Sequence, residues 1–292
     1  MSEKKTYKKT KIGEHDLKPE SLMMSYGYNP KFSENAVKPP VFLTSTFVFD
    51  SAEEGEEFFH VTSGRKPRKS NDDLGGLIYS RFNHPNVEIF EDLIAVLEGS
   101  EGCVAFASGM GAISTTLLSY LRPGDTIAHS SPLYGGTETL IRKVMREFGI
   151  KSYDFTDGLD KDAMLASMRA AAKDGPLKMV FIETPANPTN ALVDFKALNE
   201  ALDIIENETG HRPVSVCDNT MMGPVFQQAV PQGIDLAVYS VTKYLGGHSD
   251  LVAGAVCGSK EKLTPIWRLR GAMGCNLDPH TSWMISRTLE TV

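Results

Sequence analysis

Short apolar runs alternate with longer amphipathic segments along most of the chain. The short runs predict strands near residues 103–106, 126–129, 151–155, 179–182, 214–217, 236–239 and 253–258. Apolar residues three or four positions apart predict helices from about Asn86 and at 110–120, 137–148, 161–172 and 195–206, with two more after Lys260. This alternation predicts an α/β fold, a mostly parallel sheet between helices, in which the loops after the strands share one edge.

The first 60 residues differ in composition and are predicted to be an N-terminal arm and a segment that wraps over another surface. Lysines are frequent in residues 1–18, and short apolar pieces alternate with proline and glycine from 22 to 50. Residues 61–292 are predicted to form one large α/β domain. Within it, the basic, turn-rich run 62–71 is expected to be an exposed insertion.

Composition and charge narrow the possible partners. The 292 residues include 37 acidic and 30 basic ones, and the net charge of -7 argues against a nucleic-acid or membrane surface. No apolar run approaches the roughly 20 residues that span a bilayer, and no C-x-x-C or H-E-x-x-H spacing indicates a metal site. We therefore expect a cytoplasmic protein that acts on small molecules without a metal.

Lys243 follows the predicted strand that ends at residue 239, and small donors and glycines surround it. Ser240 and Thr242 offer hydroxyl groups before it, while Gly246 and Gly247 give the backbone freedom after it. This set of groups would suit a phosphate beside an amine nucleophile. Because an isolated loop lysine is usually only solvated, the assignment depends on the neighbouring loops.

A glycine-containing loop opens the predicted helix 110–120. Ser108, Gly109 and Met110 lie at the helix start, where exposed amides favour a phosphate. The loop is nearly a dinucleotide fingerprint, but Ser114 stands where the third glycine or alanine belongs. The next predicted strand also ends without an acidic residue for a ribose, so a nicotinamide cofactor is the weaker interpretation.

Three further loops after predicted strands carry candidate ligands for a ring. Tyr134, before two glycines, could stack on a cofactor ring, although a core tyrosine at a helix entry is the simpler reading. Asn187 could meet a phenolic oxygen or a substrate carboxylate. Asp218, followed by Thr220 two positions later, needs a partner: a protonated pyridine nitrogen, a helix end or a buried cation.

Tyr79 and Arg81 flank Ser80 before the predicted helix near Asn86. In an extended backbone their side chains would point the same way. A phenol and a guanidinium could then contact one anion together.

Taken together, these motifs resemble the Cys/Met-metabolism family of pyridoxal-phosphate enzymes, which includes cystathionine γ-synthase, cystathionine γ-lyase, methionine γ-lyase and O-acylhomoserine sulfhydrylase. The resemblance runs from about Tyr79 to the end of the chain. It implies a fold-type-I, aminotransferase-like domain that binds pyridoxal 5'-phosphate. It also implies a homodimer or homotetramer with shared active sites.

The resemblance assigns a role to each candidate residue. Lys243 would form the Schiff base with the cofactor and later carry protons, Asp218 would pair with the pyridine nitrogen, and Tyr134 would stack on the ring. Asn187 would contact the 3-hydroxyl, and Tyr79 and Arg81 would complete a neighbour's phosphate site. The remaining cofactor-binding residues would be Ser108, Gly109, Met110, Thr220, Ser240 and Thr242.

The expected function is γ-elimination or γ-replacement on a sulfur-containing or O-acylated homoserine-type amino acid. A catalytically incomplete cofactor-binding fragment and a nicotinamide-dependent oxidoreductase are the alternatives. Members described as methionine γ-lyases commonly have cysteine where this chain has Gly136, which favours the cystathionine enzymes or sulfhydrylases. The family's smaller C-terminal domain, which would supply the arginine for the substrate carboxylate, is expected to be absent from these 292 residues.

Overall fold

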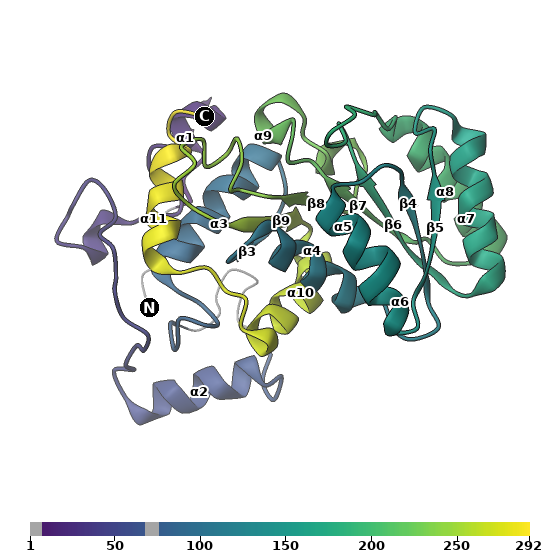
Figure 1. The fold of residues 1–292 in the computed structure, drawn as a ribbon. Coiled ribbons are helices and arrows are strands. Elements are labelled where there is room, and N and C mark those ends of the chain that lie inside the picture. Colours follow the sequence, from purple (N-terminus) through teal and green to yellow (C-terminus); the bar gives the residue numbers. More distant parts are fainter. Residues whose placement is uncertain (1–7, 68–75) are drawn as a thin grey trace.

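A seven-stranded sheet organises the computed structural model, which describes residues 8–67 and 76–292 (Figure 1). The order across the sheet is β3-β9-β8-β7-β6-β4-β5, and only β9 runs against its neighbours in this sheet. The strands are β3 Gly102–Phe106, β4 Thr126–Ser130, β5 Lys151–Phe155, β6 Leu177–Glu183, β7 Val214–Asp218, β8 Leu236–Tyr239 and β9 Gly254–Gly258. This mostly parallel sheet confirms the predicted fold class.

Helices cover both faces of the sheet, so the strands are apolar on both sides. In β8, Leu236 and Val238 join one core cluster, while Ala237 and Tyr239 join the other. The cluster with Ala237 includes side chains of α3 Pro85–Glu98, α7 Lys161–Asp174, α8 Phe195–Thr209 and α11 Pro279–Thr288. The opposite cluster includes side chains of α4 Gly109–Tyr120, η2 Leu140–Val144, α6 Met145–Glu147 and α10 Lys260–Met273.

The predicted helix 137–148 is divided in the structure. It consists of α5 Gly135–Thr139, the π-helical turn η2 and the short α6. Ile141 and Met145 are both buried across this region. Periodic apolar positions thus identified the helical segment but not its widened turn.

The reversal of β9 was not predicted. The connection from β8 to β9 has turns but no helix, and it stays at one edge of the sheet. A parallel neighbour would require a crossover back to the opposite edge. The returning strand therefore pairs antiparallel with β8 and β3, and Lys243 lies on the connection between the paired strands.

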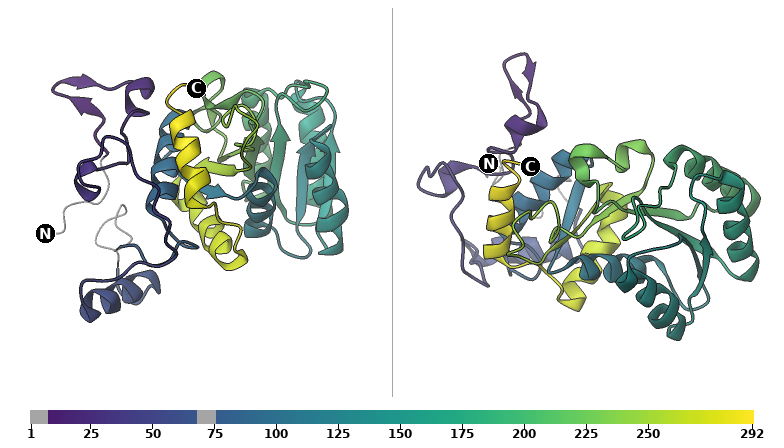
Figure 2. Two further views of the ribbon diagram at one scale, coloured as in Figure 1. Left: turned by 60° about the vertical axis from the view of Figure 1, so that its left-hand side comes forward. Right: turned by 45° about the horizontal axis from the view of Figure 1, so that its top comes forward.

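The N-terminal segments lie beside the layered body, as both views of Figure 2 show. They contain the exposed hairpin of β1 Lys11–Ile12 and β2 His15–Asp16, α1 Pro19–Leu22, η1 Pro30–Phe32 and α2 Ala52–Thr62. Val37, Leu43 and Val48 are 80%, 80% and 93% exposed. Part of the predicted basic insertion 62–71 lies outside the described residues.

The remaining short elements are α9 Gly223–Phe226 and η3 Val230–Gln232. Among the helices that the structure describes, none has the length and apolar character needed to cross a membrane.

A buried ion pair joins α3, β3 and α10. Arg270 is 2% exposed; its Nη1 lies 2.7 Å from Glu91 Oε1 and donates to Ala105 O at 2.9 Å. Its Nη2 donates to Phe82 O at 3.0 Å, and Ala105 N donates to Glu91 at 2.8 Å. Burial raises the pKa of Glu91, with the Arg270 charge opposing that effect. The guanidinium is therefore committed to the fold rather than available to a substrate.

Arg270→Met should lower the free energy of unfolding by about 3–5 kcal/mol, because it leaves the Glu91 carboxylate buried without its cation. Urea unfolding measures the loss. Exposed Arg268 on the same helix provides the matched control, and Arg268→Met should stay within about 0.5 kcal/mol of the wild type. Equal effects of the two substitutions would contradict the structural role of the pair.

Candidate active site

The loops that carry the predicted site residues meet at the carboxyl edge of the parallel strands. Glu183 at the end of β6 pairs in register with Asp218 at the end of β7, and Asp218 pairs with Val238 of β8. The loops after β3 and β4 leave the sheet at the same edge, because those strands run in the same direction as β6, β7 and β8. Ligands of open α/β sheets bind at this edge.

The start of α4 touches the residue that follows β8. A Cβ added to Gly109 would lie 2.8 Å from Ser240 Cβ and 2.9 Å from its Oγ, so only glycine allows this approach. The Ser108 hydroxyl caps α4 by accepting from Gly111 N at 3.0 Å. The first amides of a helix lack acceptors within it and favour an anion. Gly109, Met110 and the Ser240 hydroxyl thus fit a phosphate.

Asp218 is a buried carboxylate with one oxygen satisfied. It is 6% exposed, and its Oδ1 accepts from Thr220 Oγ1 at 2.6 Å and from Thr220 N at 3.1 Å. Burial raises its pKa, and the two bonds from Thr220 oppose that rise. Within residues 8–67 and 76–292, no cation pairs with Asp218 and no donor bonds its Oδ2. A protonated pyridine nitrogen fits this oxygen, and the predicted alternative of a buried salt bridge is not formed.

Thr220 joins the Asp218 carboxylate to the segment after β8. Its hydroxyl donates to Asp218 and accepts from Ser240 N at 2.8 Å. One side chain therefore fixes the distance between the residue predicted to hold the ring nitrogen and a residue predicted to hold the phosphate. Thr220 is thus a link within the protein, and its predicted contact with the cofactor stays a prediction.

Lys243 has an exposed side chain on a turn that hydrogen bonds hold at both ends. Lys243 N donates to Ser240 O at 3.1 Å, and Gly247 N donates to Lys243 O at 2.8 Å. In the described part of the chain, its amine forms no hydrogen bond or ion pair. Thr242 Oγ1 donates to Ala253 O at 3.2 Å and accepts from Ala253 N at 3.0 Å. Its hydroxyl therefore secures this loop, and its predicted phosphate contact stays a prediction.

Tyr134 and Asn187 are joined by Glu183, a residue without a predicted role. Glu183 Oε2 accepts from Tyr134 N at 2.6 Å, and Oε1 accepts from Asn187 N at 2.9 Å. Both predicted ligand side chains remain accessible, with Tyr134 45% exposed. An acidic residue that ends an apolar strand was visible in the sequence, but its backbone partners were not.

Gly136 leaves room for the Tyr134 ring. A Cβ at this position would lie 2.7 Å from Tyr134 Cε1 and 3.2 Å from Met110 Sδ. The ring therefore lies beside the predicted phosphate loop, and a cysteine at this position would require the ring or Met110 to shift.

Tyr79 and Arg81 lie together, although the backbone turns at residues 80–82 and is not extended as the prediction assumed. The Arg81 guanidinium carbon is 5.8 Å from the centre of the Tyr79 ring and 4.3 Å from that of Phe82, and Arg81 also donates to Gly271 O. Tyr79 is 41% exposed. Among the described contacts, none joins this pair to Lys243 or Asp218, so the structure does not bring them into the same chain's site.

A second buried polar network supports the end of β8, and the sequence did not reveal it. Tyr239 OH donates to Glu98, and Asn219 Nδ2 donates to Tyr239 OH at 2.9 Å. Gln227 Nε2 donates to Asn219 Oδ1 at 2.9 Å, while Val230 N donates to Glu98 Oε1 at 2.8 Å. Asn219 follows Asp218 in the sequence, and Tyr239 precedes Ser240. The network therefore ties the ends of β7 and β8 to Glu98 of α3.

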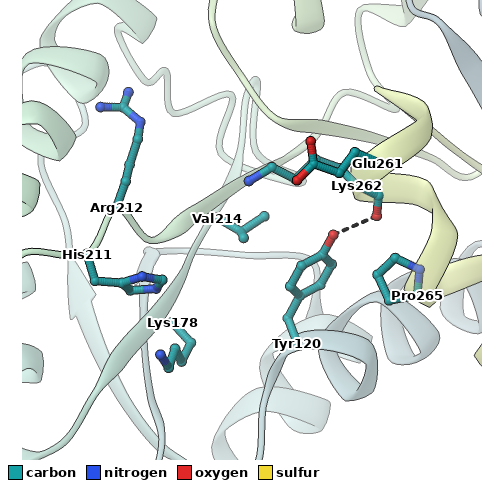
Figure 3. A pocket seen from close by; sticks show the side chains of 8 residues that line it. All are labelled: Tyr120, Lys178, His211, Arg212, Val214, Glu261, Lys262 and Pro265. Atoms are coloured by element: carbon teal, nitrogen blue, oxygen red, sulfur yellow. Dashed lines mark hydrogen bonds between the residues drawn. The ribbon is translucent and has the colours of Figure 1, made fainter.

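A cavity of about 360 Å³ lies at the opposite, amino edge of the sheet (Figure 3). Its lining comes from the end of α4 and the starts of β6, β7 and α10, and consists of Tyr120, Lys178, His211, Arg212, Val214, Glu261, Lys262 and Pro265. Tyr120 OH donates to Lys262 O at 2.6 Å. Burial raises the pKa of Tyr120 to about 12. None of the predicted site residues lines this cavity, and no cluster of metal-ligating side chains occurs in the described residues.

Comparison with known proteins gives a consistent result. The family described as Cys/Met metabolism PLP-dependent enzyme matches residues 20–292. An L-methionine gamma-lyase of Pseudomonas deceptionensis is 37% identical over 273 residues, which cover 91% of this chain and 62% of that protein. A probable cystathionine gamma-synthase of Herpetosiphon aurantiacus is 32% identical over 267 residues, which cover 91% of this chain and 74% of that protein.

A solved structure agrees with the fold. The structure of metB from Corynebacterium glutamicum superimposes with a TM-score of 0.78 at 27% identity, covering 94% of this chain and 64% of that one. The chain thus spans less than two thirds of the length of the methionine gamma-lyases that it matches.

Thr220→Val should destabilise the protein by about 1–3 kcal/mol at pH 8, because Asp218 loses a donor while it remains buried and ionised. The loss should shrink as the pH falls towards the raised pKa of Asp218, since protonation removes the buried charge. Urea unfolding of the cofactor-free protein at several pH values measures it. Thr264→Val, which removes an exposed hydroxyl on α10, is the control and should show no such pH dependence.

Proposed function

The chain belongs to the Cys/Met metabolism PLP-dependent enzyme family, and from that premise we propose that it catalyses γ-elimination or γ-replacement on a sulfur-containing or O-acylated homoserine-type amino acid. The names of its relatives include methionine gamma-lyase, cystathionine beta-lyase and cystathionine gamma-synthase. They support chemistry at amino-acid side chains with sulfur, without choosing one substrate. Because the cofactor of this family is pyridoxal phosphate, the alternative of a nicotinamide-dependent oxidoreductase is not supported.

The buried Asp218 carboxylate, with an open oxygen at the edge that also carries the Lys243 amine, is the observation that carries this proposal. Bound pyridoxal phosphate would supply an electron sink for a carbanion. Asp218 Oδ2 would keep the proton on the ring nitrogen, because a buried carboxylate favours a cationic donor. Thr220 would hold that carboxylate in place through Oδ1.

The other residues would orient the cofactor and move protons. Ser240 and the first amides of α4 would bind the phosphate, and the Tyr134 ring would cover one face of the cofactor. Lys243 Nζ would hold the cofactor covalently and then carry protons to and from the substrate. A lysine suits both tasks, because its primary amine can form a Schiff base with an aldehyde and can also accept and release a proton.

We also propose that the protein is at least a dimer with shared sites. Tyr79 and Arg81, the pair predicted to bind an anion, have no described contact with Lys243 or Asp218. The apolar side chains of Val37, Leu43 and Val48 are uncovered in a single chain. Both observations support a neighbouring copy that covers the N-terminal segment and receives the Tyr79–Arg81 pair.

Reduction of the cofactor-loaded protein with borohydride should place the pyridoxyl group on Lys243, as peptide mapping would show. Lys243→Ala should lose the label, the visible absorbance and thiol or 2-oxo acid release from methionine, cystathionine or O-acetylhomoserine. Lys196→Ala, at an exposed position of α8, should change none of them. A label on another lysine would overturn the assignment of Lys243, and wild-type protein without any label would overturn the proposed function.

Mixing inactive Arg81→Ala protomers with inactive Lys243→Ala protomers should restore activity if the sites are shared. Half of randomly mixed dimers contain both variants, and one of their two sites has both native residues, so about one quarter of wild-type activity is expected. Each variant refolded alone is the control. Confirmed mixed dimers without activity would contradict the shared site.

A further inference from the structure

Glu183 bridges two loops that are distant in sequence. It ends β6 and is 4% exposed, and its two carboxylate oxygens accept from different backbone amides: Tyr134 N at 2.6 Å and Asn187 N at 2.9 Å. Its own N–H donates to Ser130 Oγ at 3.1 Å, which fixes its backbone against the end of β4. The carboxylate thus sets the backbone positions of both residues.

Both oxygens are occupied by amides that the fold supplies. This use of both oxygens to hold backbone groups suits a positioning role. Tyr134 is the residue before α5, so its amide lies at the point where the loop enters the helix. The two residues that Glu183 joins are those expected to meet the ring face and the 3-hydroxyl of the cofactor.

We propose that Glu183 is a positioning residue whose ionised carboxylate holds Tyr134 and Asn187 in a fixed mutual arrangement, so that one cofactor ring meets both side chains. This inference rests on the proposed function. It gives Glu183 a role in cofactor binding through Tyr134 and Asn187, without a contact of its own to cofactor or substrate. Loss of the Glu183 carboxylate should free the two loops from each other without removing either ligand side chain.

The surroundings of Glu183 make this bridge sensitive to pH. The pKa of Glu183 is raised to about 7: burial and the charges of Asp218 on β7 and Glu138 on α5 raise it, while the amides of Asn187 and Tyr134 oppose the rise. Protonation places a hydrogen on one oxygen, which then becomes a much weaker acceptor for its amide. The bridge should therefore be complete above about pH 7 and incomplete below it.

The test compares Glu183→Gln with the wild type. The glutamine amide accepts through one oxygen and presents an NH₂ group to the other backbone amide, so one of the two bonds is lost. Equilibrium dialysis of the cofactor-free proteins against pyridoxal phosphate gives the dissociation constants from pH 6 to 8.5. The variant should bind about 10- to 100-fold more weakly at pH 8.5, the range expected for one lost bond to a charged group.

The ratio of the two dissociation constants is the diagnostic quantity, because titration of the cofactor itself affects both proteins equally. It should fall towards one as the pH drops through about 7, since the protonated wild type then resembles the variant. Glu138→Gln is the matched control: Glu138 accepts from Leu133 N at 3.4 Å and pairs with Arg142, but it bridges no loops. At pH 8.5, where Glu183 is ionised in both proteins, this control should bind the cofactor like the wild type.

Urea unfolding of each variant separates positioning from folding. A dissociation-constant ratio of one throughout, or a weakening that does not change with pH, would overturn the inference and leave Glu183 a purely structural acceptor. If the wild type itself binds no pyridoxal phosphate, the proposed function fails first. Binding by the wild type with an unaltered Glu183→Gln variant would refute only the positioning role.

Discussion

The site depends on two buried carboxylates that lie opposite each other at the ends of neighbouring strands. Glu183 and Asp218 pair in register on β6 and β7, and their charges disfavour each other in a region with little solvent. Each needs hydrogen-bond donors to remain ionised. Tyr134 and Asn187 supply backbone amides to one, and Thr220 supplies an amide and a hydroxyl to the other. The loops around the site are thus held in positions where they donate hydrogen bonds to these two carboxylates.

The fold was largely predictable because parallel strands covered on both faces give continuous apolar runs. The predicted strands agree with the structure to within two residues at each end, and fold-type-I membership agrees with the relatives. The reversal of β9 was not predictable from apolar runs, since they carry no direction. The division of the helix around Leu140 was also missed, because a π turn leaves little trace in the spacing of apolar residues.

Site residues were predictable where a reactive side chain lies in the loop after a predicted strand. They were not predictable where the side chain bonds to backbone groups of distant residues. Lys243, Asp218 and the Gly109 loop stand out because their residue types and positions indicate their chemistry. Glu183 does not, since its partners are amides that every residue but proline possesses, one of them 49 positions away. The hydrogen bond between the side chains of Tyr239 and Glu98 was hidden for another reason: it spans 141 positions, and apolar patterns do not show which distant residues meet.

The return of β9 beside β8 limits how Lys243 can move. Both ends of the connecting loop are anchored in paired strands, and the Thr242 hydroxyl bonds both backbone groups of Ala253 across its base. The backbone of this loop is thus held in place at both ends. An amine that must first hold a cofactor and then reach a substrate has to travel by rotation about the four carbons of its own side chain. The atoms that the Lys243 amine can reach are therefore limited by the length of its own side chain.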